Sequence, residues 1–366
     1  MKLECIIDKL YSAVIKANRI SGKKLSLLIL NNISLKAKDN ILTIQATNLD
    51  VGIKITIPVK IYIEGEIIIS GSILSSFLSN LKNDQSVMLE KKETTLSLNT
   101  KKTSTLIKLH PETDFPTIPQ TKKTHIIIVN NKELLIGLRA VWYGATNINI
   151  KPELSSVYMS LSDNTITFVS TDSFRLAEKK IKCKTVDKIE PVLIPIKNVS
   201  EIISIFEEVN GDIEIVVDKN QISFFSQNLF LTSRLVVGTF PDYQQIIPRI
   251  PLTSIIILKE DLLSALNMSQ IFSDKFNQVK ISALIKDKKL EIVTKNSDIG
   301  ENTTYIDSTV SGEDVSINFN HKYIKECFQS LYGDSVSLEL SGVGKPMVIR
   351  SVGDKSFLYL VMPMSK

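Results

Sequence analysis

Apolar residues recur at helical spacing in two sets of three segments, and the members of each set lie at nearly constant separation along the chain. The first set reads DKLYSAV, KELLIGL and EDLLSAL, with separations of 124 and 128 residues. The second set reads ILSSFLSNL, VSEIISIF and YIKECFQSL, and its members align on Leu81, Phe206 and Leu331, 125 residues apart. In all three copies the positions three, four and seven residues earlier are apolar. This spacing predicts six helices, each with a single apolar face.

Strand-like alternation of apolar and polar residues follows each predicted helix. ILTIQAT, TITFVST and LEIVTKN come after the first helix of a copy, and VMLEKKETTLSLNT, IEIVVDKNQISFFSQ and VSLELSG come after the second. Each copy therefore predicts an α+β module of about 120 residues. The proline-containing segments DFPTIPQ and TFPDYQQIIPRIP separate the copies, and their Phe-Pro pairs are 125 residues apart. We predict three tandem domains, spanning residues 1–120, 121–249 and 250–366.

Composition agrees with several globular domains and excludes few functions. A chain of 366 residues with 43% apolar and 23% charged residues is long enough for two or three ordinary cores. The net charge of +5 is mild and comes mostly from lysine. Because bidentate base reading usually relies on arginine, sequence-specific DNA recognition is not favoured. The three cysteines are far apart among apolar neighbours, which predicts reduced core thiols. No signal peptide or membrane span is predicted, so we expect a cytoplasmic protein.

The candidate catalytic and metal-binding motifs are weak. SGVGKP resembles a phosphate-binding loop, but it lacks the required glycine five residues before Gly344 and the Ser or Thr after Lys345, so a turn between strands is the better interpretation. The three histidines lie far apart, without zinc-site spacing. Asp172 and Arg175 in TDSFRLA could serve acid–base chemistry, yet a lone Asp after a strand is typically a turn former. We predict no metal and no cofactor, and an enzyme whose site assembles from distant residues stays open.

Three tandem modules together with TDSFRLA, TFPDYQQIIP and a terminal YLVMPM resemble the β subunit of bacterial DNA polymerase III, the sliding-clamp family, over the full length of the chain. The resemblance implies tandem DNA-clamp domains, each with two helices and two antiparallel sheets. It also implies a head-to-tail homodimer that closes as a ring around double-stranded DNA and raises polymerase processivity without catalysis. Enclosure needs no base-specific contact. The alternative is a basic protein that binds along the DNA surface without closing a ring.

The same resemblance implies a groove between the second and third domains that captures short apolar motifs. The partner proteins that carry these motifs would be the DNA polymerase III alpha subunit, clamp-loader subunits, other polymerases and repair proteins. A methionine-containing lining suits varied partners, although burial of Met362 and Met364 in their own core stays the alternative. The family usually has Gly-His where this chain has Ser173-Phe174, which would alter partner preference. The implied groove residues are Leu154, Thr171, Ser173, Phe174, Arg175, Leu176, Pro241, Gln245, Ile246, Gly344, Pro346, Leu360, Met362, Pro363 and Met364.

Two further sets of residues follow from the resemblance. Cations on the polar helix faces and on one loop would face DNA, with ordinary solvated surfaces as the alternative. They are Lys9, Lys16, Arg19, Lys23, Lys24, Lys132, Arg139, Lys197, Lys259, Lys322 and Lys325. The dimer interface would join the strand around Ile107 to Ile271 and Phe272 of a second copy. An exposed Ile-Phe pair is stabilised by burial against a partner, and packing at the end of its own helix is the alternative.

Overall fold

The computed structural model describes residues 1–22, 27–81, 84–111, 115–119, 121, 126–146, 151–185 and 189–364. The chain forms two compact units. The first contains Met1–Asn131, Lys184–Lys188 and Ser200–Leu235, and the second contains Lys132–Cys183, Ile189–Val199 and Val236–Lys366. The central third of the chain therefore contributes elements to both units.

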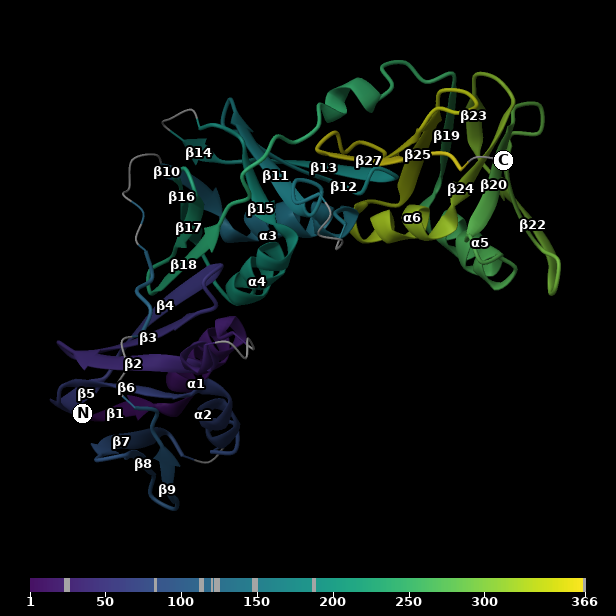
Figure 1. Cartoon of the computed structure of the whole chain (residues 1–366). Coiled ribbons are helices and arrows are strands. Elements are labelled where there is room, and N and C mark those ends of the chain that lie inside the picture. The colour runs from purple at the N-terminus through teal and green to yellow at the C-terminus, as the bar shows by residue number, and fades with distance from the viewer. Residues whose placement is uncertain are drawn as a thin grey trace. The chain divides into compact units, whose positions relative to one another are not determined.

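The same order of elements occurs three times among the described residues: one strand, a helix, five strands, a helix and three strands (Figure 1). The first repeat contains β1 (Lys2–Ile6), α1 (Ile7–Ile20), β2 (Asn32–Lys38), β3 (Ile41–Thr47), β4 (Val51–Pro58), β5 (Lys60–Ile63), β6 (Gly65–Ser70), α2 (Gly71–Leu78), β7 (Ser86–Lys92), β8 (Thr95–Asn99) and β9 (Ser104–Lys108). The second contains β10 (Ile126–Asn130), α3 (Asn131–Val141), β11 (Ser156–Ser162), β12 (Thr165–Thr171), β13 (Arg175–Lys182), β14 (Lys184–Thr185), β15 (Val192–Pro195), α4 (Ile196–Phe206), β16 (Asp212–Val217), β17 (Gln221–Phe225) and β18 (Leu229–Arg234).

The third repeat contains β19 (Thr253–Leu258), α5 (Lys259–Ile271), β20 (Gln278–Leu284), β21 (Lys289–Asn296), β22 (Gly300–Asp307), β23 (Thr309–Ser311), β24 (Val315–Asn320), α6 (His321–Glu326), β25 (Ser335–Leu340), β26 (Met347–Ser351) and β27 (Phe357–Val361). Short 3-10 turns η1 (Leu28–Asn31), η2 (Trp142–Gly144), η3 (Tyr243–Ile246) and η4 (Cys327–Ser330) complete the elements. All six predicted helices are present, and the predicted α+β triplication is confirmed.

Each repeat builds one five-stranded and one four-stranded antiparallel sheet, and the sheets of neighbouring repeats fuse. In the first unit, β14-β10-β16-β17-β18 continues through β4-β3-β2-β6, while β5-β1-β7-β8-β9 is separate. In the second unit, β15-β11-β12-β13 continues through β27-β26-β25-β19-β23, while β22-β21-β20-β24 is separate. Both junctions pair the same kinds of strand, β18 with β4 (Figure 1) and β27 with β13.

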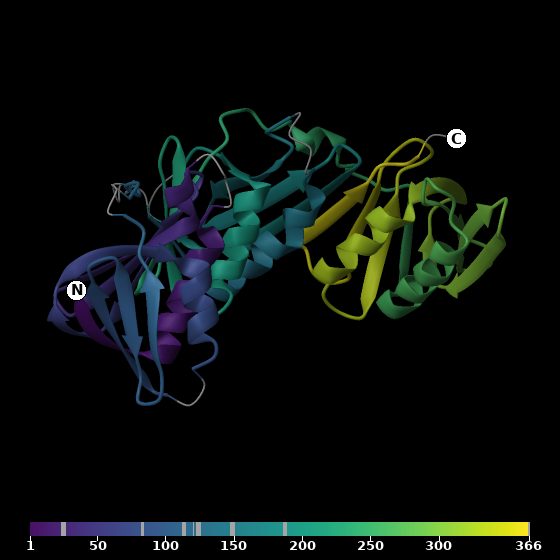
Figure 2. The ribbon, with the colours of Figure 1, turned by 60° about the horizontal axis from the view of Figure 1, so that its bottom comes forward.

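The helices bury the apolar face that their spacing predicts. Leu74, Val199 and Ile324, the positions seven residues before the alignment points, are fully buried in all three copies. Phe77 and Ile203 are the two of the nine aligned positions that are only partly buried. Within each terminal repeat the two helices contact each other, α1 with α2 and α5 with α6, and Figure 2 shows the green and yellow pair side by side. One-sided burial leaves the opposite helix face available for solvent or a ligand.

The three cysteines are free and buried, as predicted. Desolvation raises the pKa of the Cys5 thiol to about 12, and burial also raises the pKa of Cys183 and Cys327. The buried thiols are therefore protonated and poorly reactive near neutral pH. Among the described residues, the helices are too short or too polar to cross a membrane.

Candidate functional site

A tight turn between β12 and β13 carries the first part of the predicted groove. The Asp172 Oδ1 atom accepts hydrogen bonds from the backbone N–H groups of Phe174 and Arg175, each at 3.0 Å. The Thr171 hydroxyl donates to the Arg175 carbonyl at 2.6 Å. Ser173 lies at φ 77°, in the left-handed region that glycine adopts most easily. The turn therefore fixes Ser173 and Phe174 as exposed side chains, and Asp172 acts as the turn former that the sequence favours.

Arg175 is largely buried, and protein groups hold its guanidinium. It donates to Asp172 at 2.9 Å, forms an ion pair with Glu326 and lies 4.7 Å from the centre of the Tyr323 ring. Burial by itself lowers its pKa, but Tyr359, Glu326 and Asp172 outweigh burial and raise the pKa. The Phe174 ring stacks on Tyr323 with 6.5 Å between centroids. Arg175 thus supports an exposed aromatic platform, and its charge is already paired.

The C-terminal segment is held between the β12–β13 turn and the third repeat. The Met362 N–H donates to the Phe174 carbonyl and the Met364 N–H donates to the Asn318 carbonyl, both at 2.8 Å. Met362, Pro363 and Met364 are each partly buried, so one side of each remains accessible. Together with Val343, Gly344, Lys280, Ser316, Ile317 and Asn318 they line a pocket of about 690 Å³. The backbone of both methionines is therefore anchored by hydrogen bonds, while their partly buried side chains line this pocket.

A hydrophobic cluster of buried residues packs against Met362. It contains Leu176 and Leu360, both fully buried, with Phe240 and Tyr243 of the connector and Met362 packed against it. Leu154 and Pro346 are also buried. These four aliphatic and proline residues of the predicted groove are therefore core residues rather than accessible ones. The connector carries the remaining predicted residues: Pro241, Gln245 and Ile246 are exposed, and the Gln245 amide donates to Asp242 at 2.8 Å.

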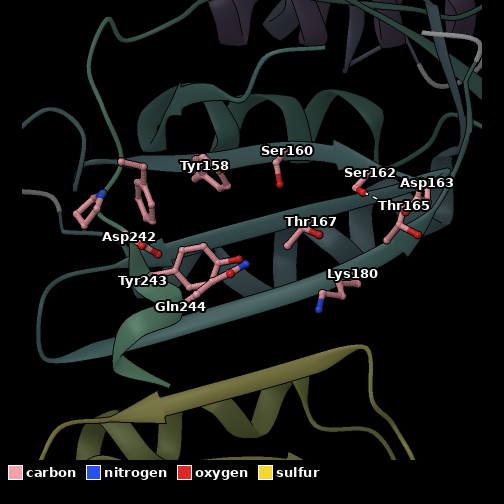
Figure 3. Close-up of a pocket in the computed structure, with 12 residues that line it drawn as sticks. Tyr158, Ser160, Ser162, Asp163, Thr165, Thr167, Lys180, Asp242, Tyr243 and Gln244 are labelled. Atoms are coloured by element: carbon pink, nitrogen blue, oxygen red, sulfur yellow. Dashed lines mark hydrogen bonds between the residues drawn. The ribbon is translucent and has the colours of Figure 1, made fainter. Parts of the chain in front are cut away.

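A second pocket, of about 510 Å³, lies on β11, β12 and β13 next to the connector (Figure 3). Tyr158 forms one wall, with its ring stacked on Phe240 at 5.0 Å between centroids. The Tyr243 hydroxyl donates to Glu178 at 2.7 Å, and burial together with this carboxylate raises the pKa of Tyr243. Serine and threonine side chains of β11 and β12 line much of the remainder, together with charged side chains such as Lys180 and Asp242, as Figure 3 shows. Sequence reasoning missed this aromatic group, for which the alternation in SVYMSLS and the repeated Phe-Pro pair were the available signals.

The turn under Phe174 has a counterpart at the junction of the first two repeats. Asn48 Oδ1 accepts from the N–H groups of Asp50 and Val51 at 3.0 and 2.8 Å, and Leu49 lies at φ 74°. The Arg234 N–H donates to the Asp50 carbonyl at 2.8 Å, as Met362 does to Phe174. The two junctions therefore share one backbone framework.

The pocket at this first junction measures about 360 Å³ and differs in chemistry. Aligned strand pairing puts Thr232 at the position of Leu360 and Arg234 at that of Met362. Gly52 occupies the position equivalent to Leu176, and a Cβ added to it would lie 2.6 Å from a side-chain carbon of Ile118. The framework recurs, but the first junction has the polar side chains of Thr232 and Arg234 where the second has Leu360 and Met362.

Six of the predicted DNA-facing cations are exposed: Lys9, Arg19, Lys132, Arg139, Lys197 and Lys322. Lys16 pairs with Glu208 at 3.2 Å, and Arg19 pairs with Glu201 at 2.6 Å. Lys259 donates to the Leu331 carbonyl at 2.5 Å, and Lys325 donates to Gln270 at 3.0 Å. Lys23 and Lys24 lie outside the described residues. The charges of Lys16 and Arg19 are thus each paired with a carboxylate of the protein itself.

The three predicted interface side chains differ in how accessible they are in the single chain. Ile107 is only 6% exposed, because it faces the core beneath β9, whereas its neighbour Leu106 is 61% exposed. The two residues alternate in direction along the strand, so a shift of one position changes the face. Ile271 is 65% exposed, and Phe272 is partly buried against Gly300. The accessible apolar pair is therefore Leu106 and Ile271.

The sequence was compared with known proteins. It matches the DNA polymerase III beta subunit in its N-terminal domain over residues 1–119, its central domain over 128–242 and its C-terminal domain over 244–365. The beta sliding clamp of Rickettsia bellii is 26% identical over 364 residues, 95% of either chain. A crystal structure of the Bacillus subtilis sliding clamp superposes with a TM-score of 0.94 at 24% identity, covering 100% of this chain and 99% of that one. The DNA polymerase III subunit beta of Bartonella birtlesii, bound to griselimycin, gives 0.92 at 26% identity and full coverage of both.

Three like domains with fused sheets define the class of protein, a DNA clamp. The domain matches extend over nearly the whole chain, in order. The chain belongs to the DNA polymerase III beta subunit family, the β sliding clamps. It is a non-catalytic subunit that confers processivity on DNA polymerase III. The predicted family, three-domain fold and function are confirmed.

Proposed function

We propose that two copies of this chain join head to tail as a closed ring around duplex DNA. The observation that carries the proposal is that both junctions between repeats pair the same two kinds of strand. Each internal junction pairs the last strand of one repeat with the third strand after the first helix of the preceding repeat, β18 with β4 and β27 with β13. In the described part of the chain, β9 pairs only with β8 and β22 only with β21. The β9 edge is the counterpart of β18 and β27, and the β22 edge is the counterpart of β4 and β13. In a head-to-tail dimer, β9 of each copy would therefore pair with β22 of the other.

The internal junctions also give the expected register of this contact. Leu231 lies opposite Ile53 at one junction and Tyr359 opposite Ala177 at the other. Following the strand pairing across each sheet, Thr105 on β9 is the counterpart of Leu231 and Tyr359. Asn302 on β22 is the counterpart of Ile53 and Ala177. Leu106 would then face Glu301 of the second copy. Pairing of two open edges satisfies backbone groups that otherwise remain exposed.

The first helices support the same contact. Arg19, Tyr143 and Ile271 are equivalent positions, nine residues after the aligned leucines. Arg19 contacts Glu201 in the next repeat, and the Tyr143 hydroxyl donates to Ser330 in the next repeat at 3.0 Å. Ile271, the equivalent side chain of the third repeat, is exposed in the single chain. We infer that it contacts α2 of the second copy.

The groove beside Met362 and Met364 is proposed as the site for apolar peptide motifs of partner proteins. Its expected partners are the DNA polymerase III alpha subunit, clamp-loader subunits, other polymerases and repair proteins, in the cytoplasm. The exposed Phe174–Tyr323 platform and the adaptable methionines favour aliphatic and aromatic side chains. The helix cations of the predicted set, Lys16 and Arg19 included, are proposed to face DNA together with Lys23 and Lys24. The domain limits 1–120, 121–249 and 250–366 stay part of the proposal.

Retention on DNA tests encirclement directly. The chain is loaded by a clamp loader onto nicked circular DNA, and half of the sample is linearised. We expect retention on circles at high salt and rapid loss from linear ends, because enclosure does not depend on phosphate contacts. Equal loss from circular and linear DNA would favour the surface-binding alternative.

A separate measurement tests the groove. Met364→Glu places a carboxylate against the apolar lining, and we expect at least a tenfold loss of affinity for a polymerase-derived apolar peptide in calorimetry. Val352→Glu is the matched control, because Val352 is exposed in the β26–β27 turn away from the pocket. Equal affinities for both variants would disprove the groove assignment.

A further inference from the structure

Two ion pairs join α1 to α4 and to the turn that follows α4, within the first unit. The Lys16 Nζ atom lies 3.2 Å from Glu208, and the Arg19 Nε atom lies 2.6 Å from Glu201. Both cations belong to the set expected to face DNA, and both carboxylates come from the following repeat, about 180 to 190 residues later in sequence. A carboxylate at this distance competes directly with any phosphate for the same cation.

The surroundings hold the pairs in place and leave them accessible. The two helices enclose a cavity of about 220 Å³, lined by Tyr11, Ile15 and Ile205 together with both cations and Glu208. The Arg19 side chain is 48% exposed, whereas the Lys16 side chain is 16% exposed and also donates to Ser12 at 3.4 Å. A phosphate can therefore approach Arg19 without rearrangement of the backbone, but either contact requires exchange of an ion pair.

This arrangement is specific to the first junction. The positions equivalent to Arg19 are Tyr143 in the second repeat and Ile271 in the third, neither of which carries a charge. At the second junction the corresponding contact is the neutral hydrogen bond from Tyr143 to Ser330. The fold thus needs no ion pair at this position, and the charges are available for another purpose.

We propose that Glu201 and Glu208 regulate the DNA contact of this chain by competing with backbone phosphates for Arg19 and Lys16. The inference rests on the proposed encirclement of DNA. An exposed ion pair favours its bound state only by a factor of up to about five. Exchange between carboxylate and phosphate is therefore rapid and weakly opposed. The cations would contact passing phosphates without holding them, which suits a ring that slides.

The test compares charge-matched variants in binding to a linear duplex of about 24 base pairs, followed by fluorescence anisotropy from about 50 to 200 mM KCl. The test variant is Glu201→Gln/Glu208→Gln. The control is Glu64→Gln/Glu93→Gln, which makes the same change in net charge at exposed positions in the strand turns β5–β6 and β7–β8 of the same unit. We expect the test variant to bind about 3- to 20-fold more tightly at low salt, with a salt slope steeper by about 1 to 2. The control should change affinity less than twofold.

A third variant separates the local effect from general electrostatics. Adding Arg19→Gln/Lys16→Gln to the test variant should remove the gain. Equal gains in test and control, or a gain that survives loss of both cations, would overturn the proposal. The single variants Glu201→Gln and Glu208→Gln, each checked by thermal melting, cover the case in which the double variant folds poorly. Failure of encirclement is recognised independently, because it appears as equal loss from circular and linear DNA while these anisotropy differences are unaffected.

Discussion

The proposed ring contact predicts a measurable loss of dimer stability when one exposed side chain is shortened. Ile271 is 65% exposed in the single chain. Full burial of an isoleucine is worth about 1.5–3 kcal/mol, so its accessible part contributes about 1–2 kcal/mol per interface. A closed ring of two chains contains two equivalent interfaces. Because Ile271→Ala keeps one methyl group, we take the lower value, about 2 kcal/mol per dimer, which corresponds to roughly 30-fold weaker association.

Ile271 is a cleaner choice than Phe272. The Phe272 ring packs against Gly300 at the start of β22, so its substitution would disturb the fold of its own chain as well as the contact. The matched control is Ile250→Ala, because Ile250 is also exposed but lies in the connector before β19. Native mass spectrometry and sedimentation equilibrium over a dilution series give the dimer dissociation constant for each variant.

We expect the wild-type chain and Ile250→Ala to agree within about twofold and Ile271→Ala to dissociate at higher concentration. Ile271→Asp should give monomers, since an unpaired carboxylate would be buried in each interface. Unchanged dissociation of Ile271→Ala would refute the assignment of this residue to the interface. A wild-type chain that remains monomeric at micromolar concentration would refute the ring itself.

Three further outcomes follow from single features of the structure. Burial, Lys322 and Lys325 lower the pKa of His321 below its ordinary 6.5, against the opposing effect of Asp274, so between the two pKa values the folded chain binds fewer protons than the unfolded one. The contribution of His321 to stability should therefore be complete above about pH 6.5 and fall as the pH drops toward the lowered pKa, by up to about 1.4 kcal/mol per unit of pKa difference. Urea titrations should show this pH dependence in the wild type and much less of it in His321→Gln. Ser173→Gly should raise the free energy of unfolding by about 0.5–1 kcal/mol by relieving the positive φ, and a loss of stability would contradict this. Calorimetry with an apolar peptide should give one site per chain, since the first junction has Thr232 and Arg234 where the second has Leu360 and Met362; two equal sites would be evidence against the chemical distinction between the junctions.

Local patterns in the sequence were sufficient to predict the repeat, the six helices and the strands around them. Helical spacing fixes which face of a helix is apolar, and burial of Leu74, Val199 and Ile324 follows from it. The turn role of Asp172 was also predictable, because the hydrogen bonds that it accepts come from residues two and three positions later. The groove residues came from family resemblance, and local pattern alone left the role of the methionines undecided.

Only the tertiary structure decided which residues from distant segments meet. Side chains alternate along a strand, so nothing in the short segment around Ile107 revealed that Leu106, one position away, is the exposed member. The pairing of Arg19 with Glu201 spans 182 residues, and no local pattern encodes it. The sequence by itself determined the elements and their repetition, since these depend on neighbours a few residues apart. The fold decided the junctions, the groove wall and the ion pairs, because those contacts depend on how strands of different repeats join.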